Sequence, residues 1–440
     1  MKYLSTKNTA IEVPFREAVL KGLASDGGLF FPRNIPKLSD EFFTSLKYKE
    51  LSDIAFEISS MFIDDIPPAI LKDIIKVAVN FPAPVKKLSE NISILELFHG
   101  NTLAFKDFGA RFLAGILEFY MKEMNRKCTI LVATSGDTGS AVASGFHGRE
   151  NIDVIILYPS GKVSRIQEQQ LTTFGDNIFA FEIEGNFDDC QHLVKTAFMD
   201  DELNRNHFLS SANSINIGRL LPQTFYYFNA FKDFDRQDQK LIFAVPSGNL
   251  GNLTSGLFAK EMGLPVDHFV SALNINDTCL RFIRTGIFSP TPSVPTISNA
   301  MDVGNPSNLE RIRFMYQDNI AVIGRNIHPY SFSDTSTRQA IEAAYNQYGY
   351  IFDPHGAVGY LAAMEDQKKS GASAYYIILE TAHPAKFINE INLSSRIKIE
   401  TPPRLLEFLK KEKKAIVVQK DYTRFKTELT KLLLARDTTI

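Results

Sequence analysis

The stretch LIFAVPSGNLGNLTSGLFAKEM, residues 241–262, joins a short apolar run, a glycine-bearing loop and a helical pattern. The run LIFAV has the length and composition of a buried strand, and the loop PSGNLGN follows it directly. Gly248 and Gly251 would let backbone N–H groups turn toward one point, since a Cβ there would crowd an anion or forbid a positive φ, and the next helix adds its positive end. The loop is therefore either a phosphate cradle or an ordinary tight turn.

The same order of strand, loop and helix recurs along the chain. CTILVA at residues 128–133 precedes TSGDTG, DVIILY at 153–158 precedes PSGKVSRIQ, and AYYIIL at 374–379 precedes ETAHPAKF. Repeated alternation of this kind is typical of parallel sheets that helices cover on both faces. Ligands of such sheets bind at the carboxyl ends of the strands, where these loops lie. The predicted fold class is α/β.

Two of these loops look alike but are interpreted differently. TSGDTG, residues 134–139, offers hydroxyls, two glycines and a helix start, which suit a carboxylate or a phosphate. An N-cap with a turn glycine explains the same letters, and for this loop alone it is the better interpretation. In PSGKVSRIQ, Lys162 and Arg165 are expected to lie in solvent at a helix start.

A lysine in apolar surroundings is the strongest chemical signal. Lys106 lies within HGNTLAFKDFGARF, residues 99–112, and the apolar spacing after it predicts a helix with a buried face. Desolvation favours the neutral amine, which is the form that an imine-forming lysine requires. For an isolated lysine the alternatives are a stem that covers Phe105 while the ammonium reaches water, or a pair with Asp107.

The composition excludes several classes of protein. The 440 residues include 48 basic and 50 acidic side chains, spread evenly, without the basic stripe of a nucleic-acid binder. Three distant cysteines without CxxC spacing argue against disulfides and a zinc site and fit a reducing compartment. The N-terminus lacks an apolar leader, and no run approaches the roughly 18 apolar residues of a membrane span. We expect a soluble, cytoplasmic protein with no nucleic-acid partner, no membrane partner and no metal.

Several motifs, in the same order along the chain, resemble a known enzyme family. A lysine N-terminal to a doubly wound sheet, an SGxTG loop and a later GNxG loop resemble the fold-type II pyridoxal-phosphate enzymes. Among these, the chain is most similar to the threonine synthase family of the short, microbial and fungal type, over nearly its whole length. The matching stretches are GLASDGGLFFP, ELFHGNTLAFKDFGARF, ATSGDTGSAV, SANSINIGRLLPQ, PSGNLGNLTSGLFAK, SNAMDVGNPSN and ETAHPAKF.

The resemblance implies an activity and a cofactor. The family converts O-phospho-L-homoserine and water to L-threonine and phosphate, by γ-elimination and β-addition of water, with pyridoxal 5'-phosphate. Lys106 would be the Schiff-base lysine and would also shuttle protons. Thr381 would face the pyridine nitrogen, where a hydroxyl tempers the electron sink. The cofactor phosphate would be held by the amides of Gly248, Asn249, Leu250, Gly251 and Asn252.

The resemblance also assigns residues to the substrate. Its carboxylate would be received by Ser135, Gly136 and Thr138. Its phosphate would be held by Asn213, Ser214 and Arg219 of SANSINIGR. The planar guanidinium of Arg219 suits bidentate phosphate binding, although a surface arginine on an amphipathic helix is the alternative.

Asp137 departs from the pattern of many fold-type II enzymes. These enzymes place an asparagine there, and its amide hydrogen-bonds the phenolic oxygen of the cofactor. A carboxylate would repel that oxygen unless it were protonated or turned away. Asp137 is therefore assigned to the cofactor site without a defined role.

Three domains are predicted along the chain. Residues 1–92 would form a mostly helical domain, with FREAVLKGLA and PPAILKDIIKVAV as helices and FPAPVKKL as its end. Residues 93–235 would carry Lys106 and a small α/β domain on the substrate side. Residues 236–440 would form the large cofactor-binding α/β domain and C-terminal helices, with a charged helical tail after about Arg396.

Other functions stay open at this point. A sibling phospho-lyase that releases 2-oxobutanoate and a threonine dehydratase share the scaffold, as would a non-catalytic phosphometabolite-binding protein. An anion site at Arg219 argues against the dehydratase, and Lys106 argues against a pure binder, which has no need of an imine. The expected partner is a small molecule, O-phospho-L-homoserine, and both a monomer and a homodimer are open.

Overall fold

The computed structural model describes residues 1–236, 238–370, 373–391 and 398–437. Two compact units share the chain: unit 1 comprises Met1–Phe112 and Ser214–Thr401, and unit 2 comprises Leu113–Asn213 and Pro402–Ile440. Each unit contains a parallel sheet with helices, which confirms the predicted α/β class. Both units draw on separated stretches of chain, whereas the domains predicted with boundaries at 92 and 235 are continuous. That domain division stays a prediction.

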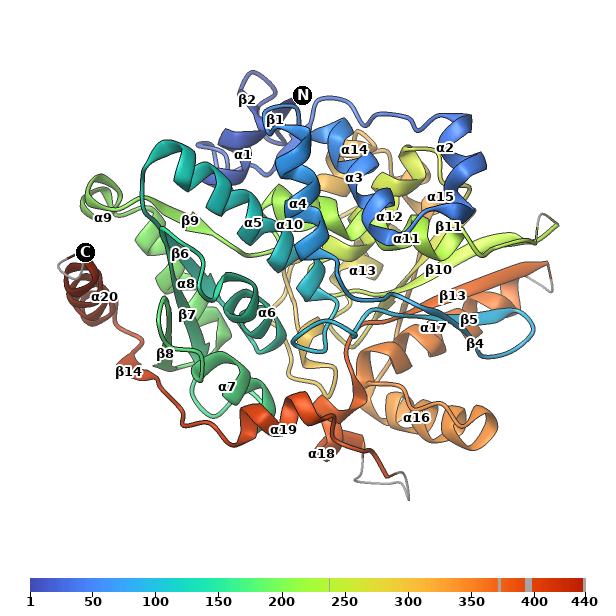
Figure 1. The fold of residues 1–440 in the computed structure, drawn as a ribbon. Coiled ribbons are helices and arrows are strands. Elements are labelled where there is room, and N and C mark those ends of the chain that lie inside the picture. The colour runs from blue at the N-terminus through green and yellow to red at the C-terminus, as the bar shows by residue number, and fades with distance from the viewer. Residues whose placement is uncertain (237, 371–372, 392–397, 438–440) are drawn as a thin grey trace. The chain divides into compact units, whose positions relative to one another are not determined.

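The large sheet of unit 1 places the LIFAV strand near its middle (Figure 1). In the described residues the strand order is β12-β11-β10-β13-β5-β4, parallel except that β4 pairs antiparallel with β5. Because β11 and β13 flank β10, the glycine loop that follows β10 lies between the loops that follow its two neighbours. The strands are β4 Val85–Lys87, β5 Ile92–Glu96, β10 Lys240–Pro246, β11 His268–Leu273, β12 Ile327–Ser331 and β13 Ala374–Glu380.

Helices cover both faces of this sheet. Figure 1 shows α11 and α12 on one face and α16 and α17 on the other. Small side chains such as Ala357 and Ala362 let α17 pack closely on the buried aliphatic residues of the strands. The helices of unit 1 after residue 213 are α10 Ile217–Leu220, η2 Leu221–Thr224, α11 Phe225–Phe231, α12 Gly251–Glu261, α13 Thr278–Thr285, η3 Asn299–Met301, α14 Leu309–Met315, α15 Ile320–Asn326, α16 Asp334–Tyr348, α17 Pro354–Ser370, η4 Pro384–Phe387 and α18 Ile388–Ile391.

The first 92 residues contain more strand than the sequence predicted. The two quoted helices are present, as α1 (Phe15–Lys21) and α4 (Pro68–Ala78). A small antiparallel sheet of order β2-β1-β3 accompanies them, and β4 joins the edge of the large sheet. Strands of three residues such as EVP and FFP are too short to show alternation, so they were missed. The remaining elements are β1 Lys2–Ser5, β2 Glu12–Pro14, β3 Phe30–Pro32, α2 Asp40–Ser45, η1 Leu46–Tyr48 and α3 Leu51–Phe62.

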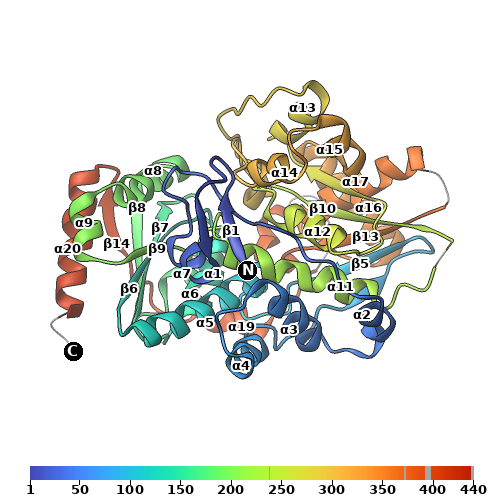
Figure 2. The same ribbon diagram turned by 90° about the horizontal axis from the view of Figure 1, so that it is seen from above.

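Unit 2 has a parallel sheet of its own (Figure 2). Its order in the described residues is β14-β8-β7-β6-β9. Figure 2 shows α8 and α20 on one face of these strands and α6 on the other. The long helix α5 (Lys106–Met124) starts in unit 1 and ends in unit 2. The other elements are β6 Cys128–Ala133, α6 Asp137–Phe146, β7 Ile152–Pro159, α7 Arg165–Thr172, β8 Ile178–Glu184, α8 Phe187–Phe198, α9 Asp201–Asn206, β9 Leu209–Ser211, α19 Pro403–Leu409, β14 Ile416–Gln419 and α20 Tyr422–Asp437.

The C-terminal tail is only partly helical. Arg396 lies outside the described residues, and beyond it β14 separates two helices. Alternate exposed and buried residues in IVVQ reflect the position of β14 at the edge of the unit 2 sheet. Among the helices of the described residues, none has the length and apolar character that crossing a membrane demands.

Candidate active site

Lys106 is the first residue of α5 and is half-buried. Its Nζ lies 5.8 Å from the centre of the Phe105 ring. The next residue, Asp107, turns back into the preceding loop, where its carboxylate accepts hydrogen bonds from the Thr102 N–H (2.8 Å) and Oγ1 (2.7 Å). Burial raises the pKa of Asp107, although these hydrogen bonds and the charge of Lys386 oppose the rise. Asp107 thus fixes the loop that presents Lys106.

The loop after β13 is hydrogen-bonded to the residues just before Lys106. The Phe105 N–H donates to the Thr381 carbonyl at 2.8 Å, and the His383 N–H donates to the Leu103 carbonyl at 3.0 Å. A β-bridge joins residues 104 and 382 between these two hydrogen bonds. Thr381 is buried. Lys106 and Thr381, both predicted to contact the cofactor, therefore lie on adjoining segments of unit 1.

The loop after β10 has the features of an anion-binding turn. Leu250 adopts the left-handed conformation, with φ 58° and ψ 9°, immediately before α12 begins. Within the described part of the chain, the backbone N–H groups from Gly248 to Asn252 meet no acceptor. Successive free N–H groups at a left-handed residue and a helix N-terminus form a concavity that binds anions. This geometry supports the phosphate cradle over the ordinary turn.

The positive φ angles predicted for the two glycines of this loop are wrong, whereas the crowding of an anion by a Cβ there stays a prediction. The positive φ falls on Leu250, and neither Gly248 nor Gly251 needs one. At Gly248 a Cβ would lie 2.8 Å from the Met301 Cα and 2.9 Å from the carbonyl oxygen of residue 300, so close backbone packing requires glycine. At Gly251 the nearest atom would be the Asn308 Nδ2 at 3.4 Å, an ordinary contact. Only Gly248 is demanded by the surrounding protein.

Ser214 and Arg219 also lie in unit 1, close to these loops. The Asn249 Nδ2 donates to the Ser214 Oγ at 2.6 Å, which joins the two predicted phosphate sites directly. Arg219 is 3% exposed, so the surface-arginine alternative is wrong. Its Nε would lie 2.9 Å from a Cβ at Gly109, one turn along α5 from Lys106. Burial lowers the pKa of Arg219 to about 10, and the Asp107 charge opposes this.

Sequence reasoning missed two residues, Asn308 and Arg311, that hydrogen-bond the glycine loop and the Ser214 segment. Asn308 donates through Nδ2 to the Asn249 carbonyl at 3.0 Å. Arg311 is fully buried and donates to Asn308 Oδ1 at 2.6 Å and to the Ile215 carbonyl at 2.5 Å. It thereby ties the Ser214 segment to the glycine loop. The stretch SNAMDVGNPSN, which ends at Asn308, was the signal, but its letters alone do not assign a role.

A second missed set supports the Thr381 loop. Glu380 is fully buried at the end of β13 and accepts the Asp353 N–H at 2.6 Å. The Asp353 carboxylate accepts the Ala382 N–H at 3.3 Å and contacts the His355 Nδ1. The His355 Nε2 in turn accepts a backbone N–H at 3.2 Å from residue 300, whose carbonyl faces Gly248. Buried polar contacts thus connect the supports of the Thr381 and glycine loops.

The predicted substrate-carboxylate residues lie in unit 2. Thr134 Oγ1 accepts the N–H groups of Gly136 (2.9 Å) and residue 139 (2.8 Å), which shapes the turn at the start of α6. Gly136 has φ 140°, and a Cβ there would lie 2.5 Å from the Gln167 side chain. Ser135 and Thr138 are half-buried.

Asp137 and Asn213 are held within unit 2 as well. Asp137 is buried, and its Oδ1 accepts a hydrogen bond from Gln167 Nε2 at 3.1 Å. This contact occupies one oxygen of the carboxylate within unit 2. The Asn213 Nδ2 donates to the carbonyl of residue 133 at 3.4 Å. Lys162 and Arg165 are exposed at the start of α7, as expected.

Comparison with known proteins bears on all these elements. Three family models match: the threonine synthase N terminus at residues 2–79, the pyridoxal-phosphate dependent enzyme at 78–380 and the C-terminal threonine synthase model at 356–428. A threonine synthase of Buchnera aphidicola is 42% identical over 429 residues, covering 97% of this chain and 99% of its own length.

The chain belongs to the threonine synthase family.

Solved structures of threonine synthases agree over the full fold. The crystal structure of the Escherichia coli threonine synthase has a TM-score of 0.91 and 40% sequence identity, with 98% of this chain and 100% of that chain covered. The threonine synthase of Brucella melitensis, solved with bound pyridoxal phosphate, has a TM-score of 0.89 and 34% identity, covering 96% and 97% of the two chains. As a pyridoxal-phosphate-dependent family, the threonine synthases are lyases, which confirms the predicted class of enzyme and its cofactor.

Proposed function

We propose that this chain converts O-phospho-L-homoserine and water to L-threonine and phosphate with pyridoxal 5'-phosphate, as the last step of threonine biosynthesis. The observation that carries the proposal is the joining of the Lys106 and Thr381 segments by the hydrogen bond from Phe105 to Thr381. Family membership over nearly the whole chain supports the same reaction.

The residues present in unit 1 fit the cofactor. The N–H groups from Gly248 to Asn252 offer a cradle for its phosphate, and Lys106 offers an amine for its aldehyde carbon. The buried Thr381 offers a hydroxyl for the ring nitrogen. When bound, pyridoxal phosphate withdraws electrons from the carbon atoms of the substrate and so makes their protons removable.

The chain's own residues must then move protons and hold charge. We assign the removal of protons at Cα and Cβ of the substrate, and their return, to the Lys106 Nζ. Phosphate leaves from Cγ, and water adds at Cβ. Arg219 and Ser214 are assigned to that phosphate, since a desolvated guanidinium holds a phosphate more strongly than one in water.

Unit 2 supplies the remaining assignments. Ser135, Gly136 and Thr138 are proposed to bind the substrate carboxylate at the N-terminus of α6. Asn213 is proposed to contact the substrate phosphate. Asp137 is proposed to stabilise that loop through the hydrogen bond from Gln167, and not to contact the cofactor directly.

The test is the fate of phosphohomoserine with the purified holoenzyme. Equal amounts of threonine and phosphate are expected, and 2-oxobutanoate would instead indicate the sibling lyase. Substitution of Lys106 by Ala should abolish turnover and the borohydride-fixed cofactor adduct while the circular-dichroism spectrum stays that of the parent. Substitution of the exposed Lys162 by Ala is the matched control and should leave both readouts unchanged.

Two other outcomes would indicate a different Schiff-base lysine or a non-catalytic binding protein. An adduct that maps to another lysine would contradict the assignment of Lys106. A chain that binds phosphohomoserine without turnover in the presence of the adduct would be the non-catalytic binder. A cytoplasmic location is also proposed, supported by three buried, free cysteines.

A further inference from the structure

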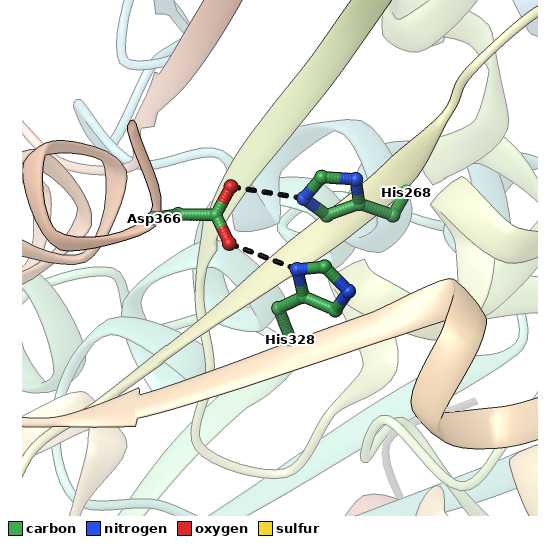
Figure 3. A group of neighbouring side chains, drawn as sticks. All are labelled: His268, His328 and Asp366. Atoms are coloured by element: carbon green, nitrogen blue, oxygen red, sulfur yellow. Dashed lines mark hydrogen bonds and ion pairs between the residues drawn. The ribbon is translucent and has the colours of Figure 1, made fainter. Parts of the chain in front are cut away.

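A second polar cluster lies in unit 1, on the amino-terminal side of the large sheet (Figure 3). His268 begins β11, His328 is the second residue of β12, and Asp366 is near the end of α17. The carboxylate of Asp366 lies against both rings: the His268 Nε2 is 3.0 Å from one oxygen and the His328 Nδ1 is 2.8 Å from the other. These candidate ligand atoms all lie within 4.8 Å of one another.

Neighbouring hydroxyls hold the carboxylate in place. Those of Tyr376, Tyr330 and Ser370 donate to it at 2.8, 3.0 and 3.1 Å. Asp366 is fully buried. A fixed carboxylate thus faces two imidazole nitrogens.

His268 has a carboxylate on each of its ring nitrogens. Its Nδ1 is 2.8 Å from Asp267 Oδ2, and its Nε2 is 3.0 Å from Asp366 Oδ2. A carboxylate only accepts hydrogen bonds, and a neutral imidazole has a single N–H to donate. The other ring nitrogen of a neutral imidazole carries a lone pair, which is what a metal ion binds. A carboxylate on the far nitrogen is also what orients histidine ligands in metal sites.

The second imidazole adds a second nitrogen ligand. The rings of His268 and His328 are 3.8 Å apart between centroids and tilted by 31°, and each directs a nitrogen at the Asp366 carboxylate. One divalent ion could be shared by these two nitrogens and a carboxylate oxygen. Two imidazole nitrogens and a carboxylate oxygen, with water as the fourth ligand, form a set that zinc accepts at roughly 2.0–2.2 Å.

We propose that His268, His328 and Asp366 bind one divalent transition-metal ion. Because His328 is 37% exposed through its side chain, the ion can enter from solvent and keep a water ligand. Two lysines lie nearby: Lys240 pairs with Asp267 at 3.1 Å, and Lys369 donates to the Tyr330 hydroxyl at 3.3 Å. Lys369 is exposed, so its ammonium can turn into solvent when the ion binds.

The ion would act as a clamp and take no part in turnover. Its ligands join two neighbouring strands to the helix that packs on them, at the end of the sheet where β11 and β12 begin. The loops of the candidate active site follow the opposite, carboxyl ends of the strands. The inference is therefore independent of the proposed function, and its readouts do not involve phosphohomoserine.

The experiment measures Zn²⁺ binding to the full chain after chelator treatment and removal of the chelator. Calorimetric titration should show one site, and Zn²⁺ should raise the melting temperature in proportion to its occupancy. Substitution of His328 by Asn keeps a hydrogen-bond donor toward Asp366 but removes the nitrogen ligand. It should weaken zinc binding at least about 10-fold, the lower limit seen when even a supporting partner of a metal ligand is lost.

The matched control removes a histidine–carboxylate pair that has no second imidazole. His147 contacts Asp176 at 3.0 Å on the surface of unit 2, and its substitution by Asn should leave zinc binding at the parent value. If the His328 variant folds poorly, His268→Asn supplies the second test. Zinc binding that is equal in parent and both ligand variants would overturn the proposal. So would a parent that binds no zinc, which would leave a cluster held by protons alone.

Discussion

At the scale of single residues, Arg219 gives the sharpest test of the substrate site. Charge-assisted hydrogen bonds to phosphate are worth about 1.5–3 kcal/mol each. Loss of a bidentate pair in Arg219→Ala should therefore lower kcat/KM for phosphohomoserine on the order of 100-fold. Because the phosphate departs as an anion, kcat should fall as well as KM rise. Steady-state kinetics and cofactor titration of the same variant check this.

The burial of Arg219 dictates the control. Truncation of a buried side chain leaves a cavity, so Arg219→Ala should also lose some thermal stability. Arg219→Lys keeps most of the volume and the charge but lacks the planar fork, and should restore activity only in part. Cofactor affinity should match the parent in the lysine variant. If cofactor affinity falls along with turnover in that variant, Arg219 serves the cofactor or the fold.

The sequence allowed candidate residues to be named, but it did not predict the contacts that hold them. Lys106 and the glycine loop could be singled out because the one precedes a helix and the other follows a recognisable strand, whereas Thr381 was assigned through the family resemblance. The hydrogen bond that Asp137 accepts could not be predicted, because its donor Gln167 belongs to a different helix. Arg311 and Asp353 were missed since their value depends on burial and on backbone carbonyls or N–H groups far along the chain.

At the scale of elements, the loop after β10 separates two effects of adding a side chain. A Cβ at Gly248 would meet the backbone of residues 300–301, whereas Gly251 has room for one. Gly248→Ala should therefore lower both the melting temperature of the apo form and the cofactor affinity. Gly251→Val should weaken cofactor binding much more than it lowers that melting temperature. Calorimetry of the apo forms and cofactor titration measure the two effects.

One result would contradict the phosphate cradle and favour an ordinary turn after β10. Equal cofactor affinity in Gly251→Val and the parent would mean that no anion lies in front of the loop. Gly263 follows the same helix, and a Cβ there would make an ordinary contact with the Phe43 ring at 3.4 Å. It offers no matched control because its φ is 112°. Gly324→Ala is the better control, since its nearest atom would be 3.8 Å away without a positive φ.

The end of β13 predicts a pH dependence of stability. Burial, with the nearby charge of Asp353, raises the pKa of Glu380 well above its usual range. Above pH about 4.3 the unfolded chain gives up this proton while the folded chain keeps it, so this carboxyl makes stability fall as pH rises. The fall ends once pH exceeds the raised folded pKa. Its slope can reach about 1.4 kcal/mol per pH unit.

Glu380→Gln removes that proton equilibrium while it keeps the shape of the side chain. Urea unfolding between pH 5 and 8 should show that the variant gains stability relative to the parent as pH rises. Glu390→Gln, near the end of α18 and paired with Arg338 at 3.1 Å, serves as the control and should follow the parent. Parallel stability curves for Glu380→Gln and the parent would contradict the raised pKa.

At the scale of the whole molecule, the alternation of strands and helices was enough to predict the class of fold. The apolar runs at residues 128–133, 241–245 and 374–379 all became buried parallel strands. The N-terminal sheet and β14 were not predicted, because strands of three or four residues carry too few letters for a periodic signal. Their partners come from distant segments, which local propensity does not encode.

The three buried thiols predict how the native chain reacts. Cys128, Cys190 and Cys279 are at most 1% exposed, and burial raises the pKa of Cys190 and of Cys279 to about 12. A thiol reagent should therefore modify none of them in the native protein and all of them in guanidinium chloride. At guanidinium concentrations that only partly unfold the protein, mass spectrometry should show that the cofactor slows labelling at Cys279, the thiol of unit 1. Rapid labelling of the native protein would contradict the burial.

The interleaving of the two units along the chain bears on how the nascent protein assembles. Strand β13 fills the gap between β10 and β5, and β14 completes the outer side of β8, yet both are synthesised late. Until they leave the ribosome, β5 is paired only with β4 and its other side is open, and β8 also exposes an open edge. Such edges invite wrong pairing with other chains. Emergence of residues 374–419, more than that of any earlier region, is thus the event that lets both sheets close. During translation the chain should depend on chaperones until that point.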